Sequence, residues 1–84
     1  MQSFATTRFA RPVTIRLSRN SHDQTVVDAV QASQILMRKW PRDSAKRQAA
    51  MSECLRVLRG EAPSPIARRA FEAAAIEAHI LAGD

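Results

Sequence analysis

Two breaks in the chain most constrain what these 84 residues can fold into. The first is Pro41, which biases Trp40 away from helical angles and stops any helix there. The second is Gly60 followed by Pro63, where a glycine just past a helix supplies the left-handed residue that ends it. The segments between and after these breaks have apolar residues at helical spacing. The sequence therefore predicts three short helices after residue 28.

The first helix is predicted to begin at Asp28 and to run to Trp40. Asp28 is a good N-cap, and Gln31 three residues later completes a capping box. Arg38 and Lys39 suit the negative end of the helix dipole. Helical spacing gives this helix an apolar face made of Ala29, Ala32, Ile35, Leu36 and Trp40, widened by Val30 and Met37.

The second helix is predicted to begin near Asp43 or Ser44 and to end before Gly60, and the third is capped by Ser64 with Pro65 at its first position. Gly83 marks the predicted exit from the third helix. The second helix carries the stripe Ala50, Cys54 and Leu58, flanked by Met51, Leu55 and Val57. The inner face of the third helix is predicted to be Ala67, Ala70, Phe71, Ala74, Ala78 and Leu81.

The segment before the helices has the alternation of a half-buried strand. Val13, Ile15 and Leu17 alternate with polar residues between 9 and 18, and a short β-favouring run at 24–27 follows a turn cluster at 19–23. The predicted fold class is α+β, with a short N-terminal antiparallel β-hairpin packed against three α-helices. Residues 1–8 are expected to be a flexible tail and 9–84 a single α+β domain, because the chain is long enough for only one modest core.

The basic charge is concentrated in the first half of the chain. Residues 1–47 hold nine Lys+Arg against three Asp+Glu, a net +6, whereas residues 48–84 are at −1. Such asymmetry suggests nucleic acid or a membrane surface as partner. A solvated surface with genomic arginine bias, or self-association through opposite charges, explains it equally well. In the nucleic-acid interpretation, non-specific contacts to phosphates would be made by Arg8, Arg11, Arg16, Arg19, Arg38, Lys39 and Arg42.

Several kinds of chemistry are not expected. Gly60 and Gly83 are the only glycines, so no phosphate-binding loop is predicted, and no apolar run approaches the 18 residues of a membrane span. Cys54 lies on an apolar stripe and is interpreted as a small buried hydrophobe. His22 and His79 lack neighbours at metal-ligand spacing, and His79 is assigned a stabilising role at a helix C-terminus. We expect no enzyme activity, catalytic residue, metal, cofactor or small-molecule ligand.

The chain resembles the domain-of-unknown-function 982 family, which occurs mainly in rhizobia and their relatives. Five local features carry the resemblance: Phe9 with Pro12-Val13; Ala32, Leu36 and Trp40-Pro41; Ala50, Cys54, Leu58 and Gly60; Ala67-Arg68 with Ala70-Phe71; Ala74-Ala75 with Glu77-Ala78. His79 departs from the pattern, which has a small residue there. The resemblance implies a cytoplasmic protein of a Gram-negative bacterium and no particular activity.

The function predicted from these observations is a non-enzymatic protein-interaction or regulatory module. The open edge of a two-stranded sheet can accept a further strand, including one from a second copy in a homodimer. A basic nucleic-acid-binding protein that uses the arginine-rich N-terminal half is the alternative. The candidate interaction surface comprises Arg11, Arg16, Arg38, Lys39, Trp40, Arg42 and Arg68.

Overall fold

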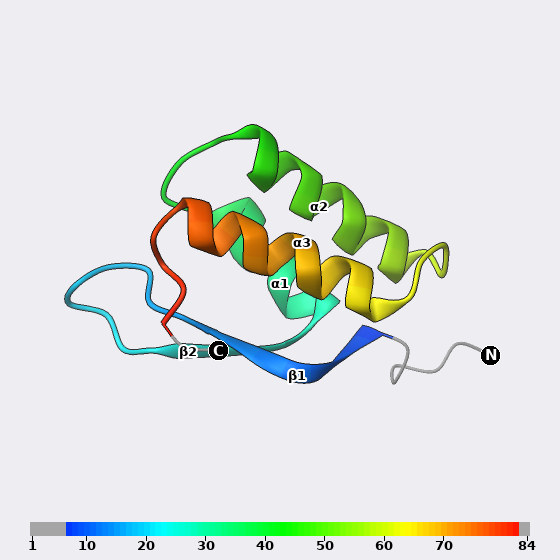
Figure 1. The fold of residues 1–84 in the computed structure, drawn as a ribbon, viewed down its shortest axis with the longest axis horizontal. Helices are drawn as coiled ribbons and strands as arrows, with labels where there is room; N and C mark the ends of the chain where they lie inside the picture. Colours follow the sequence, from blue (N-terminus) through cyan, green and yellow to red (C-terminus); the bar gives the residue numbers. More distant parts are fainter. Residues whose placement is uncertain (1–6, 83–84) are drawn as a thin grey trace.

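The computed structural model describes residues 7–82 and has the predicted α+β architecture, with the three helices on one side of a two-stranded antiparallel sheet (Figure 1). Residues 1–6 of the expected tail and Gly83 lie outside the described residues. No helix among residues 7–82 is long and apolar enough to cross a membrane. The elements are β1 (Arg8–Ile15), β2 (Gln24–Asp28), α1 (Ala29–Arg38), α2 (Ala45–Leu58) and α3 (Ser64–Glu77).

The sheet is held in register by its buried valines. Val13 lies opposite Val26, and an irregularity between Arg8 and Val13 accommodates Pro12, which cannot donate to a ladder. β1 begins one residue before the predicted start and stops at Ile15, so Leu17 lies beyond the strand. The burial predicted from the alternation is confirmed for Val13 and Ile15, which are both fully buried.

The C-terminal segment covers the other edge of β1. Leu81 forms an isolated antiparallel bridge with Ile15. The Arg16 N–H donates to the Ile80 carbonyl (2.8 Å) and the Ala82 N–H donates to the Thr14 carbonyl (2.9 Å). The prediction that Leu81 belongs to the inner face of the third helix is therefore wrong: α3 ends at Glu77, and the chain then descends to the sheet (Figure 1).

Two helix ends use the same capping geometry. At the end of α2, Gly60 has φ 77°, its N–H donates to the Val57 carbonyl (3.0 Å), and the Glu61 N–H donates to the Arg56 carbonyl (2.8 Å). This is a Schellman motif, with the predicted glycine in the left-handed position. At the end of α3 the left-handed residue is His79 (φ 59°), and the equivalent bonds run from His79 to Ile76 (3.1 Å) and from Ile80 to Ala75 (3.0 Å).

The predicted helix starts need one correction. Asp28 and Ser44 cap α1 and α2 as expected, each accepting from a backbone N–H three residues later. α3 begins one residue early, because Pro63 is its N-cap and Ser64 is already helical. A proline in the first turn, here Pro65, allows this start, since the N–H it lacks would have no partner within the helix. α1 ends at Arg38, before the predicted Trp40.

The core lies between the sheet and the helices, around Phe71 on α3. The Phe71 side chain is fully buried, and the ring of half-buried Trp40 packs against it with centroids 5.4 Å apart and planes at 59°. Val30, Met37 and Leu55 were expected to widen the apolar faces, but they are exposed. Each helix of so small a domain has contacts on one side only, so its buried stripe is narrower than its apolar stripe.

Candidate functional site: a basic groove at one end of the domain

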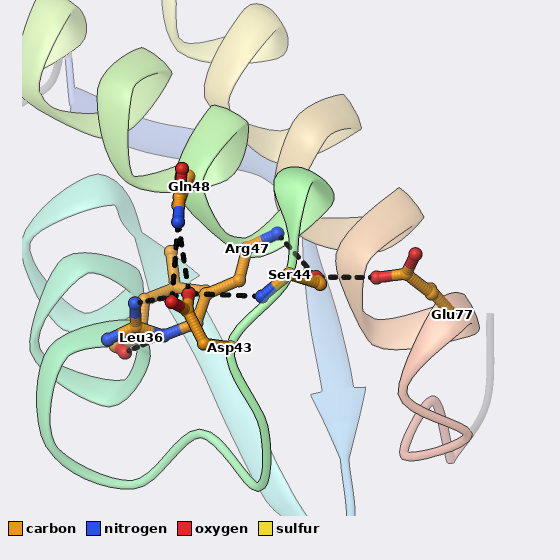
Figure 2. Close-up of polar contacts among 6 residues, drawn as sticks. All are labelled: Leu36, Asp43, Ser44, Arg47, Gln48 and Glu77. Carbon is orange, nitrogen blue, oxygen red and sulfur yellow. Dashed lines mark hydrogen bonds and ion pairs between the residues drawn. The ribbon is translucent and has the colours of Figure 1, made fainter.

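A hydrogen-bonded corner fixes the end of the domain where α1 passes into α2 (Figure 2). Arg47 Nε donates to the Leu36 carbonyl (2.9 Å), one of the carbonyls left unpaired at the end of α1, and Arg47 Nη1 pairs with Asp43 Oδ1 (3.2 Å). Ser44 Oγ accepts from the Arg47 N–H (3.1 Å) and donates to Glu77 Oε1 (2.6 Å). The corner thereby ties the end of α1 and the start of α2 to the last residue of α3.

Replacing Arg47 with methionine is expected to lower the free energy of unfolding by about 1–2 kcal/mol, because the charged donor leaves the Leu36 carbonyl without its partner. Lys46→Met is the matched control: it removes the same charge from the adjacent, exposed position, and it should change stability by less than about 0.5 kcal/mol. Urea unfolding followed by circular dichroism measures both. Equal effects of the two substitutions would contradict the role given to Arg47.

Beside this corner lies an open groove of about 580 Å³, which is lined by residues of the hairpin loop, the α1–α2 loop and the segment after α3. Its lining combines aliphatic side chains with charged ones from segments about sixty residues apart in sequence. The lining residues are Arg16, Leu17, Ser18, Arg19, Asp23, Pro41, Ala78, His79, Ile80, Leu81 and Ala82.

The groove and its surroundings are rich in cations that lack an acidic partner. Arg16 Nε pairs with Asp23 Oδ1 at 2.8 Å, which neutralises one charge of the lining. The side chain of Arg19 has no ion pair or hydrogen bond within residues 7–82. The same holds in this range for Arg38, Lys39 and Arg42, which lie within three residues of the lining residue Pro41. Guanidinium groups bind carboxylates through paired hydrogen bonds, so this end of the molecule is suited to an anionic ligand.

The predicted interaction residues divide between two places. Arg16 lines the groove. Four others lie within three residues of the lining residue Pro41: Arg38 at the end of α1, then Lys39, Trp40 and Arg42. Trp40 packs on Phe71 and contributes to the core.

The other two predicted residues lie together where β1 meets α3. Arg68 Nε donates to the Arg11 carbonyl (2.7 Å), and Arg68 Nη1 lies 3.6 Å from Glu72 Oε1, the ion pair expected from their i,i+4 spacing. Arg11 is five residues from Arg16 along β1, a distance of about 16 Å in an extended strand. Arg11 and Arg68 therefore do not belong to the groove.

The outer edge of β2 is less open than the sequence suggested. Gln31 Nε2 donates to the Thr25 carbonyl and Gln31 Oε1 accepts from the Val27 N–H, both at 3.0 Å, so its amide takes the place of a neighbouring strand. The predicted capping box is only half formed: Asp28 caps the Gln31 N–H (2.8 Å), but the return bond reaches Val27. Asp28 lies opposite Arg8 in the ladder, whereas the Val27 N–H faces outward.

The only thiol of the chain, that of Cys54, does not line the groove. Cys54 is fully buried, and burial, aided by the charge of Glu53, raises the pKa of its thiol from 9.0 to about 12. Among residues 7–82, no three His, Cys, Asp or Glu side chains lie close enough to hold a metal ion. The groove offers the guanidinium groups of Arg16 and Arg19 and the imidazole of His79 as hydrogen-bonding groups. They lie beside an aliphatic floor formed by Leu17, Ile80 and Leu81.

The sequence predicts an interaction role for Arg16 but gives no indication that residues 78–82 line the same groove. His79 was assigned only a stabilising role, and Leu81 was placed on a helix face. No local signal in residues 78–82 indicates that they lie beside the hairpin loop, because that proximity depends on the bridge between Leu81 and Ile15.

The fold and the groove define a small α+β domain whose cationic end is built from both halves of the chain. A family model described as "Protein of unknown function (DUF982)" matches residues 11–82, so the chain belongs to that family. The matched range includes every residue that lines the groove. No curated protein and no solved structure matches the chain.

Proposed function

We propose that this chain is a non-enzymatic, cytoplasmic protein-interaction module that binds an acidic segment of a partner protein in the end groove. The observation that carries the proposal is Arg19, which is exposed and has no side-chain partner within residues 7–82, beside the aliphatic floor. Arg38, Lys39 and Arg42, which are close in sequence to the lining residue Pro41, add positive charge to this end of the domain. A segment with alternating acidic and aliphatic side chains matches both features, because its carboxylates meet the cations while its aliphatic groups cover the floor.

The backbone of Leu81 supports an extended conformation for the bound segment. The bonds from Arg16 to Ile80 and from Ala82 to Thr14 flank the bridge, so the Leu81 N–H and C=O point away from β1. Neither group has a partner within residues 7–82. A peptide laid along Leu81 would add a strand beyond it, which is the strand-addition mode of recognition at a different edge from that of β2.

Fluorescence anisotropy with a labelled octapeptide of alternating Asp and Val tests the proposal at low salt. We expect Arg19→Glu to weaken binding at least tenfold, because it replaces an attractive charge with a repulsive one in the groove. Arg69→Glu is the matched control, since it makes the same change of charge at an exposed position on α3 outside the groove. We expect Arg69→Glu to reduce affinity for the peptide by no more than about twofold, because it acts only through the net charge of the protein.

Three outcomes would overturn this function. Equal losses for Arg19→Glu and Arg69→Glu would indicate attraction to net charge without a site. Tighter, steeply salt-dependent binding of single-stranded DNA of equal length would favour the nucleic-acid alternative. A concentration-dependent dimer in sedimentation velocity that Arg19→Glu disrupts would place a second copy of the chain in the groove.

A further inference from the structure

The Schellman motifs at the ends of α2 and α3 differ in the residue that occupies the left-handed position. In α2 the left-handed residue is Gly60, which has no Cβ to clash with the backbone. In α3 the same position holds His79 at φ 59°. A residue with a Cβ is disfavoured in this conformation relative to glycine, so the end of α3 is built with avoidable backbone strain.

The backbone hydrogen bonds of this turn would form equally well with glycine, and no contact of the His79 side chain within residues 7–82 compensates for the strain. The His79 side chain is exposed, and it makes no hydrogen bond, ion pair or ring contact within residues 7–82. It does line the groove, together with Arg16, Arg19 and Asp23 from the hairpin loop. The imidazole is therefore placed where a bound ligand would meet it.

We propose that His79 is a ligand-binding residue of the groove, whose ring N–H donates a hydrogen bond to a carboxylate or carbonyl oxygen of the bound acidic segment. This inference rests on the function proposed above. The left-handed conformation places the second residue after α3, His79, in the lining of the groove, where a glycine would present no side chain to a ligand. Backbone strain that the fold itself does not need is typical of binding sites.

The competing explanation is that His79 stabilises the domain through the dipole of α3. The two explanations predict opposite effects of His79→Gly on stability. If the histidine serves binding, glycine relieves the strain, and we expect the melting temperature to rise by about 4 °C, after allowance for the greater freedom of glycine in the unfolded chain. If the histidine serves the dipole, the melting temperature falls.

The experiment measures melting temperature and affinity for the labelled Asp-Val octapeptide in the same variants. His79→Gly should be more stable than the wild type and should bind about tenfold more weakly, because it loses a hydrogen bond to a charged acceptor. His79→Asn keeps a side-chain N–H donor and tolerates left-handed angles, so it should retain most of the affinity. Gly60→His puts the same side chain in the equivalent motif of α2, and it should lower the melting temperature and leave binding unchanged.

The outcomes separate this inference from the function on which it rests. If Arg19→Glu weakens binding and His79→Gly does not, the groove remains the binding site and the role of His79 is wrong. A lower melting temperature for His79→Gly also overturns the role of His79. If neither substitution affects peptide binding, the proposed function itself fails.

Discussion

Replacing Phe71 with alanine is expected to lower the free energy of unfolding by about 3–5 kcal/mol. Phe71 is the largest of the fully buried side chains, so its removal leaves a cavity between the sheet and the helices. The substitution also removes the ring against which Trp40 packs. A domain of this size has a total stability of about 4–13 kcal/mol, so the variant would lie close to the limit of folding.

Urea unfolding followed by circular dichroism and by Trp40 fluorescence measures this effect. Ile76→Ala is the control on the same helix, because Ile76 is 56% exposed and its truncation should cost less than about 1 kcal/mol. Comparable losses in the two variants would show that Phe71 is not the centre of the core.

Stability is expected to fall between pH 9 and pH 12 because of Cys54. Its buried thiol keeps its proton up to a pKa of about 12, whereas in the unfolded chain the thiol ionises near 9.0. Between these values the unfolded chain binds fewer protons than the native state, so raising the pH favours unfolding. The decrease can reach about 1.4 kcal/mol per pH unit and is absent below about pH 9.

Cys54→Ala isolates this contribution from the other groups that titrate at high pH. The variant is less stable below pH 9 because of the cavity, but this deficit relative to the wild type should shrink as the pH rises above 9. Chemical denaturation at pH 8, 10 and 11 provides the comparison. A constant difference across this range would mean that the native thiol ionises as readily as the unfolded one.

The candidate site could be predicted only in part. The charge count favours the first half of the chain, and of the residues predicted there Arg16 lines the groove, while Trp40 and Arg42 are next to the lining residue Pro41. The candidate surface also includes Arg11, from the basic half, and Arg68, from the half at −1, although the Arg68 side chain donates to the Arg11 carbonyl away from the groove. Net charge along a sequence does not specify which cations share a surface or which are engaged by backbone carbonyls.

The sequence by itself determined the features that act over a few residues. The caps Asp28 and Ser44, the left-handed Gly60 and the alternation of Val13 and Ile15 all work through neighbours in the chain, so their consequences were predictable. The α+β class follows from them, because the strands and the helices each have an apolar face that must be buried in one shared core.

Only the tertiary structure decided the contacts that join distant segments. Gln31 turns to the edge of β2, Arg47 reaches back to α1, and Leu81 leaves the predicted helix to extend the sheet beside Ile15. In each case the partner lies outside the helix or turn in which the sequence places the residue. The groove exists because that last contact brings His79 beside the hairpin loop. A contact across some sixty residues depends on how the whole core closes, and no short stretch of sequence encodes it.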